Sequence, residues 1–135
     1  MSRIRLVIVM SAAMLALPLI VEAHHSAVMF DDQKAVTFDG VVKEFQFTNP
    51  HSWLLVDVTN KDGSVTTWGF EAEGPTTLIR NGVRPADLKF GTKVSITGHP
   101  MKDGRPAALW MKAVRDDGKE FFPGGRPAAA AVGGQ

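Results

Sequence analysis

Hydrophobic and polar residues alternate from Val36 to Val42, and this two-residue period is typical of a half-buried β-strand. The even-numbered positions share the apolar face there, whereas Phe45 and Phe47 continue it on odd numbers. The phase therefore shifts near Lys43-Glu44, as it does at a β-bulge. A long first strand bent by a bulge suits a small closed barrel.

A second strand is predicted over Ser52–Thr59, directly after Asn49-Pro50, because proline lacks the amide hydrogen that a strand ladder needs. Its alternation gives a buried face and an outer face. The buried residues are Leu54, Val56 and Val58, and the outer ones are Trp53, Leu55 and Asp57. Asp62-Gly63 supplies a tight hairpin turn, so residues 65–71 return as a third strand.

One short helix is predicted over residues 74–82, with Pro75 at its first position and Gly82 as its stop. We expect Leu78 and Ile79 to plug one end of the barrel. Two more strands follow, at residues 93–98 and 107–114, and then a short terminal segment at 120–122. This order predicts an all-β protein with one short helix, a small OB-like five-stranded barrel. An open sheet covered by one helix is the alternative.

The chain begins with a hydrophobic leader. Arg3 and Arg5 precede an apolar run from Leu6 to Val21, and Val21 and Ala23 place small residues at a cleavage site. The run is shorter than the roughly 20 residues that a membrane-spanning helix needs. We interpret residues 1–23 as a signal peptide cleaved after Ala23, with an uncleaved anchor as the alternative.

Cleavage would leave one domain at residues 24–122 and a low-complexity tail at 123–135 that we expect to be disordered. Of the 135 residues, 112 would remain, enough for one modest core. Without Arg3, Arg5 and Glu22, the 15 basic and 14 acidic residues become 13 of each. This balance argues against a nucleic-acid partner and against a membrane surface after signal cleavage.

Cysteine is absent from the sequence, so disulfides and a lipidated N-terminal cysteine are excluded. The leader also lacks a twin-arginine pair. We therefore expect the mature protein in a Gram-negative periplasm, with a secreted eukaryotic protein as the alternative.

Three histidines are the predicted metal ligands. His24 and His25 would open the mature chain, where their imidazoles join a terminal amine in a nitrogen-rich set that suits Cu(II). His51 lies in a turn in which Pro50 restricts the backbone and Trp53 provides an aromatic side chain on one side. The alternatives are a flexible end that binds metal only as any peptide does, and a His51 that merely braces the corner. Copper is the metal expected, with no other cofactor.

His99 and Met101 offer another way to complete a site, and Met29 would add a second thioether suited to Cu(I). In an OB-like order, His99 falls near the start of the first strand and His51 near its end. Whether His99 and Met101 replace His51 stays open.

Two acidic residues flank the end of the third predicted strand. Glu71 and Glu73 could form a carboxylate pair, although acidic residues beside a helix start usually serve its dipole. The sequence has no Ser-His-Asp spacing, no glycine-rich phosphate loop and no nucleophilic cysteine. We therefore predict no enzymatic activity.

Several stretches resemble a family of small exported bacterial proteins known only as a domain of unknown function. They are Ala-His-His-Ser at 23–26, Thr-Asn-Pro-His-Ser-Trp at 48–53, Trp-Gly-Phe-Glu at 68–71, Leu-Lys-Phe-Gly at 88–91 and Val-Ser-Ile-Thr-Gly at 94–98. The resemblance implies an exported single-domain β protein with His24, His25 and His51 as signature histidines. It brings no established activity.

Two functions follow as hypotheses. The first is a periplasmic protein that binds a transition metal, copper above all, through the mature N-terminal histidines. The second is a non-enzymatic interaction module that binds a protein, peptide or saccharide on the face of strands two and three, where Trp53 points outward.

Overall fold

The computed structural model describes residues 28–128. The strands are β1 (Val36–Gln46), β2 (Ser52–Thr59), β3 (Val65–Ala72), β4 (Lys93–Pro100), β5 (Ala107–Arg115) and β6 (Glu120–Phe121). Helix α2 (Pro75–Arg80) and the 3-10 turn η1 (Pro85–Asp87) connect β3 to β4. The strand ranges agree closely with the alternation in the sequence.

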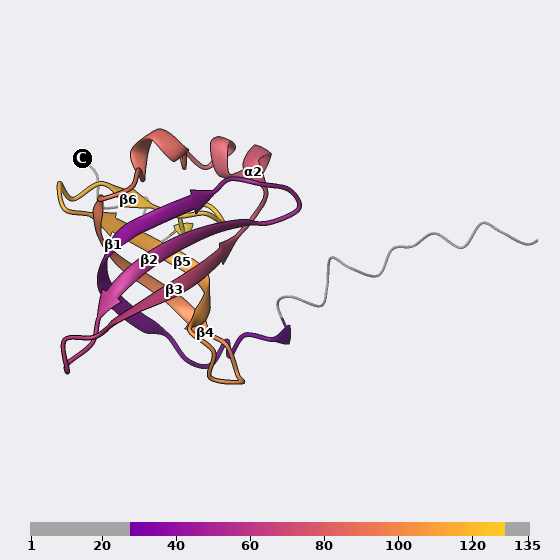
Figure 1. The fold of residues 1–135 in the computed structure, drawn as a ribbon. Helices are drawn as coiled ribbons and strands as arrows, with labels where there is room; N and C mark the ends of the chain where they lie inside the picture. Colours follow the sequence, from indigo (N-terminus) through magenta and orange to yellow (C-terminus); the bar gives the residue numbers. More distant parts are fainter. Residues whose placement is uncertain (1–27, 129–135) are drawn as a thin grey trace, which may run out of the picture.

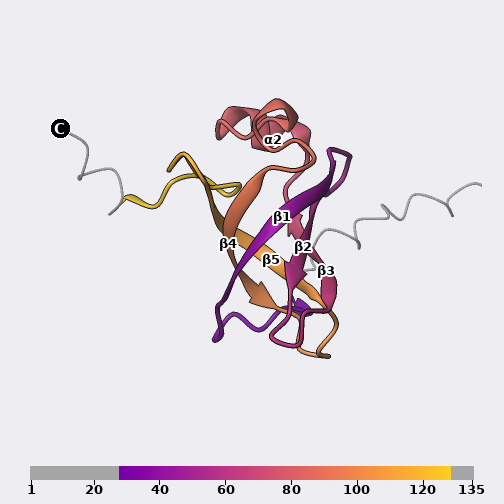
Figure 2. The same ribbon diagram turned by 60° about the vertical axis from the view of Figure 1, so that its left-hand side comes forward.

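Five strands close into a barrel, and Figures 1 and 2 show their course. The sheet order is β3-β2-β1-β4-β5-β6, and a parallel pairing of β3 with β5 joins the two sides. The ring β1-β2-β3-β5-β4 is that of the predicted OB-like barrel, with one short helix between β3 and β4. The alternative of an open sheet is therefore wrong.

The predicted bulge in β1 is confirmed. Its pairing with β2 shifts register between Val42 and Glu44. The first half of β1 pairs with β4 and the second half with β2, so the bent strand turns one corner of the barrel. This bend sets the direction of the loop that follows β1.

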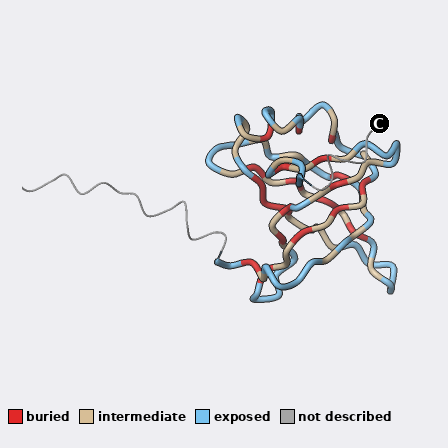
Figure 3. Tube along the Cα trace, turned by 180° about the vertical axis from the view of Figure 1, so that it is seen from behind, coloured by how far each residue is buried: buried red, intermediate tan, exposed pale blue. Residues whose placement is uncertain are grey.

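The core fills the barrel, as the buried positions in Figure 3 show. Leu54, Val56 and Phe70 have no exposed surface, which confirms the predicted phase of β2. At the end of the barrel covered by α2, Leu78 is fully buried, whereas Ile79 is 45% exposed. The prediction that both would plug this end is thus wrong for Ile79, because a two-turn helix has only one inward face.

Packed structure continues past β6. Pro123 is buried, and its carbonyl oxygen accepts a hydrogen bond of 2.6 Å from the Asn81 side-chain amide after α2. This hydrogen bond therefore ties the segment that follows β6 to the residue that follows α2. Within residues 28–128, no helix is long and apolar enough to cross a membrane.

An ion-pair network fastens η1 to the β5–β6 turn. The Arg115 guanidinium donates to both oxygens of Asp117, at 2.9 and 2.5 Å, and also to the carbonyl oxygen of Asp87, at 3.0 Å. The hydrogen bond from Arg115 lowers the pKa of Asp117 to about 2. The carboxylate of Asp117 therefore stabilises the folded state only while it is ionised.

We expect the contribution of Asp117 to be complete above its ordinary pKa of 3.8 and to disappear as pH falls toward about 2. Thermal unfolding of the parent and of Asp117→Asn between about pH 6 and pH 2 measures this. The stability difference between the two proteins should shrink over the acid range. A difference that stays constant down to the lowest pH would contradict the role of Asp117.

Candidate functional site

The candidate site pairs His51, at the end of the β1–β2 loop, with Glu71 on β3. Trp53 pairs with Glu71 in the sheet, and His51 lies two residues before Trp53, so all three belong to the outer face. His51 Nδ1 lies 2.8 Å from Glu71 Oε1. The side chains are 30% and 7% exposed, respectively. A buried carboxylate thus holds an imidazole that is partly open to solvent.

The loop that carries His51 is fixed at several points. The Thr48 hydroxyl donates to the His51 carbonyl oxygen at 3.0 Å, and the Ser52 hydroxyl donates to the Thr48 carbonyl oxygen at 3.3 Å. The Asn49-Pro50 peptide bond is cis. A side chain added at Gly74 would meet the Pro50 carbonyl oxygen at 2.9 Å, so glycine lets the loop pack against the start of α2. The position of His51 is therefore well defined.

An apolar wall lies beside the pair. A side chain at Gly69 would contact the Trp53 ring at 3.2 Å, so the indole lies over this glycine. Leu109 of β5 pairs with Glu71 on its other side. The Glu71 carboxylate is thus set between two strands that present apolar side chains, which accounts for its burial.

The geometry of the pair assigns different roles to the two imidazole nitrogens. Nδ1 of His51 contacts Glu71, so Nε2 is the nitrogen available to another group. An imidazole nitrogen held in this way can bind a metal or accept a proton. The adjacent hydroxyl is not a nucleophile for such a base, because Ser52 is buried and bonded to Thr48.

Of the three predicted metal ligands, the structure describes only His51. His24 and His25 lie outside the described residues. Within residues 28–128, no group of three or more histidine or acidic side chains could hold a metal ion. His51 and Glu71 alone make a two-residue set, and a metal centre at His51 needs ligands from elsewhere.

His99 has a separate contact. Its Nδ1 lies 2.5 Å from the carbonyl oxygen of Lys34, in the segment that leads into β1. Leu109 pairs with both His99 and Glu71, so β5 separates them by two strand spacings, about 10 Å. His99 is therefore closer to Glu71 than the pairing of β1 with β4 alone implies, because β5 lies between β3 and β4.

Met29 and Met101 differ in their exposure to solvent. Phe30 and Met101 form an antiparallel bridge, and both are buried. Met29, the residue before Phe30, is 44% exposed. A Cu(I) site at His99 and Met101, with Met29 as a second thioether, stays a prediction.

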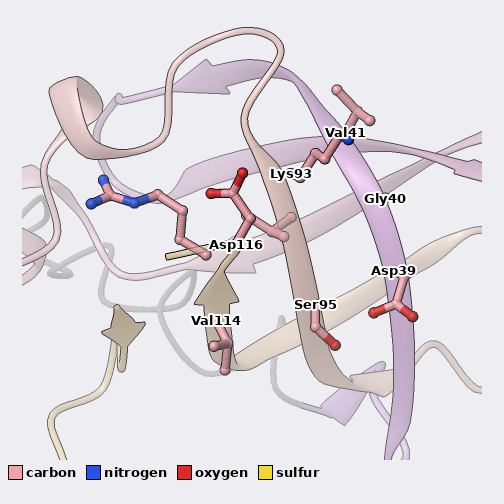
Figure 4. Close-up of a pocket in the computed structure, with 9 residues that line it drawn as sticks. Asp39, Gly40, Val41, Lys93, Ser95, Val114 and Asp116 are labelled. Carbon is pink, nitrogen blue, oxygen red and sulfur yellow. The ribbon is translucent and has the colours of Figure 1, made fainter. Parts of the chain in front are cut away.

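Two hollows on the described surface lie away from His51 and Glu71. Figure 4 shows one of about 420 Å³ over β1, β4 and β5, lined in part by Asp39, Lys93, Ser95 and Asp116. A second, of about 510 Å³, adjoins it beside Phe90, which is 83% exposed. Neither hollow is lined by a histidine, so neither adds a ligand to His51.

Sequence reasoning considered Glu71 with Glu73 and missed its pairing with His51. In the structure Glu73 is exposed, and its carbonyl oxygen accepts a hydrogen bond from the Ser52 amide. The sequence of the β2–β3 hairpin contains the information needed to find this pair. Counting back from the Asp62-Gly63 turn brings Trp53 opposite Glu71 and puts His51 on the same face.

Comparison with known proteins places the chain in a family. No curated protein and no solved structure matches it. The model of one family matches residues 10–110, which include His51, Glu71 and most of the barrel. The chain therefore belongs to the family of unknown function DUF6152.

Proposed function

We propose that this protein is an exported, non-enzymatic periplasmic protein that binds Cu(II) through His51 together with His24 and His25. The observation that carries this proposal is the His51 imidazole itself. It stands on a fixed loop, is partly exposed, and has Nδ1 engaged so that Nε2 is free for a ligand bond. The amine and imidazoles of a chain that starts at His24 supply the remaining nitrogen ligands that Cu(II) prefers.

The described start of the chain is anchored on the barrel. The Lys102 amide donates to the Met29 carbonyl oxygen at 3.0 Å, and its ammonium donates to the Val28 carbonyl oxygen at 3.0 Å. Figure 1 shows this segment beside the turn between β4 and β5. The four residue steps from His24 to Val28 span at most about 14 Å.

That reach is comparable with the width of the sheet to be crossed. Met101 bonds to Ala107, and Ala107 pairs with Gly69, two residues before Glu71 on β3. Two strand spacings across the sheet and two residues along β3 give a straight-line distance of about 12 Å from Met101 to Glu71. The reach of an extended segment from His24 to Val28, with the length of the histidine side chains added, therefore matches this distance. This match supports the proposal of a site shared with His51.

Calorimetric titration with Cu(II) tests the proposal, on protein whose intact mass shows that it begins at His24. We expect one-to-one binding that weakens as pH falls, because the ligand nitrogens must lose protons. His51→Ala should lower affinity by about 10- to 100-fold. Affinity is measured where the variant is folded, because the substitution also leaves the buried Glu71 carboxylate without its partner and lowers the unfolding temperature. His99→Ala, which removes a histidine bonded to Lys34, is the matched control and should keep the parent affinity.

A peptide beginning His-His-Ser supplies the decisive comparison. Equal affinities for the peptide, the parent and His51→Ala would show that the amino-terminal segment binds copper alone. The shared site would then be wrong.

A second candidate function rests on the outer face of β2 and β3. There the Trp53 ring lies over Gly69, with Leu55 beside it, as an apolar surface that suits a peptide or saccharide partner. Such a partner would shift the indole N–H signal of Trp53 in NMR spectra. Copper binding at His51 would not require such a partner on the outer face of β2 and β3.

A further inference from the structure

We propose that this protein forms a two-fold homodimer in which the Phe90 ring of each copy enters the hollow over β1, β4 and β5 of the other. The inference goes beyond the proposed function, because it involves neither copper nor His51. It rests on an exposed aromatic side chain on a fixed turn, an apolar hollow that adjoins it, and a balanced set of charges around both.

The first observation is the exposure of Phe90. Its side chain is 83% exposed, the highest value among the large hydrophobic side chains exposed in residues 28–128. The Leu-Lys-Phe-Gly stretch at 88–91 otherwise serves the fold, since Leu88 is fully buried and Gly91 adopts a positive φ of 83°. Packing within the barrel therefore explains Leu88 and Gly91, but it does not explain the aromatic residue between them.

The second observation is the turn that carries Phe90. The Thr92 amide donates to the Lys89 carbonyl oxygen at 3.0 Å and closes a β-turn. Phe90 and Gly91 are the two central residues of this turn. The Gly91 amide donates to the Val42 carbonyl oxygen at 2.8 Å, and the Val42 amide donates to the Thr92 carbonyl oxygen at 2.8 Å. The turn is therefore fixed to β1, so little backbone entropy is lost when a partner covers it.

The third observation is the hollow of about 420 Å³ over β1, β4 and β5, shown in Figure 4. It adjoins the hollow beside Phe90, because both are lined by Lys93 and Asp116. Val41, which is 39% exposed, and Val114 contribute apolar side chains to its lining. An apolar cavity of about 150 Å³ is enough to hold a benzene molecule. The hollow over the three strands can therefore admit a phenyl ring.

The charges around the two hollows favour a second copy as the occupant. Two acidic and two basic residues of their linings form no ion pair within residues 28–128; they are Asp39, Asp116, Lys89 and Lys93. A surface that carries both signs equally is complementary to another surface that carries both. A second copy of this chain provides such a surface, whereas a nucleic acid or an anionic membrane would favour a basic face.

Two-fold symmetry then uses the aromatic ring and the hollow together. In a two-fold dimer the same patch of each copy faces the other, so every contact forms twice. When Phe90 of one copy enters the hollow of its partner, the partner's Phe90 enters the hollow of the first copy. Aromatic side chains that fill a pocket at the centre of an interface supply much of its binding energy. The adjoining ring and hollow on one patch are what this arrangement requires.

Analytical ultracentrifugation of the chain that begins at His24 tests the proposal. A chelator is present, so that copper cannot link two copies. We expect the parent to form a dimer at concentrations up to about 100 μM. Phe90→Ser should raise the dissociation constant at least about 30-fold, as the loss of a central aromatic contact does. It should keep the parental unfolding temperature, because the ring is already exposed in the single chain. Val65→Ser, at a residue of β3 that is 60% exposed and lines neither hollow, is the matched control and should keep the dimer.

A second variant blocks the hollow and leaves Phe90 intact. Ser95 lines the hollow from β4, so the indole of Ser95→Trp should occupy the space that the partner's Phe90 needs. We expect this variant to be monomeric at concentrations where the parent is a dimer. A parent that stays monomeric would overturn the proposal, even if the Phe90 turn bound a different protein. A dimer that survives both Phe90→Ser and Ser95→Trp would lie on another face and would overturn it as well.

Charge-reversed variants show whether the partner is a second copy of this same patch. A variant with Lys89→Glu and Lys93→Glu has an acidic patch, and one with Asp39→Lys and Asp116→Lys has a basic patch. Each should be monomeric alone because like charges face each other across the two-fold axis. A mixture of the two should form a heterodimer. Two variants that each dimerise as well as the parent, or a mixture that stays monomeric, would contradict the self-complementary patch.

Discussion

Val56→Asp is expected to abolish most of the stability of the barrel. Val56 has no exposed surface and lies in the main core cluster. The substitution removes apolar contacts and places a carboxylate where the barrel offers it no partner. We expect a loss of at least about 4 kcal/mol, which is a large part of the 5–15 kcal/mol that holds a domain of this size together. Urea unfolding followed by far-UV circular dichroism measures the loss.

Leu55→Asp is the matched control on the neighbouring position. Leu55 belongs to the outer face, where it pairs with Gly69 and is half-buried. A carboxylate there remains in contact with water, so we expect a loss of about 1 kcal/mol. Equal losses for Val56→Asp and Leu55→Asp would contradict the inward and outward assignment of β2.

The barrel was predictable because its strands follow a strict two-residue period between strong turn signals. The buried apolar positions of β2, Leu54, Val56 and Val58, were identified from alternation alone, and the bulge in β1 was visible as a change of phase near Lys43. Ile79 shows where such reasoning stops. Both Leu78 and Ile79 are apolar, and only the placement of α2 on the barrel end decides which one is buried.

The candidate site was predictable only in part, for a related reason. His51 was singled out by its local turn, which is a property of adjacent residues. Its partner Glu71 lies 20 positions farther along the chain, and the contact depends on the register of β2 with β3. The position of His99 likewise depends on β5, which pairs with both β3 and β4. The His51–Glu71 contact thus follows from the hairpin register, whereas the position of His99 depends on barrel closure, which no local pattern encodes.

Barrel closure also explains the second large effect that we expect, at Gly98 in β4. The pairing of β4 with β5 shifts register between Thr97 and Gly98, and β5 passes very close to the glycine. A side chain there would meet the Leu109 carbonyl oxygen at 2.5 Å and the Ala108 methyl group at 2.9 Å. Neither neighbour is the end of a flexible side chain, so the two strands would have to separate.

We therefore expect Gly98→Ala to cost about 3 kcal/mol, the upper part of the range for overpacked cores. Because β5 also carries Leu109 beside Glu71, displacing it should disturb the His51–Glu71 contact as well. Gly124→Ala is the control, since a side chain there meets nothing within 4 Å, and its stability should stay within about 0.5 kcal/mol of the parent. Urea unfolding of both variants gives the stabilities, and the His51 imidazole signals report on the site. A Gly98→Ala protein with parental stability would mean that β4 and β5 lie farther apart than their register requires. It would contradict the closure of the barrel beside Glu71 that is described above.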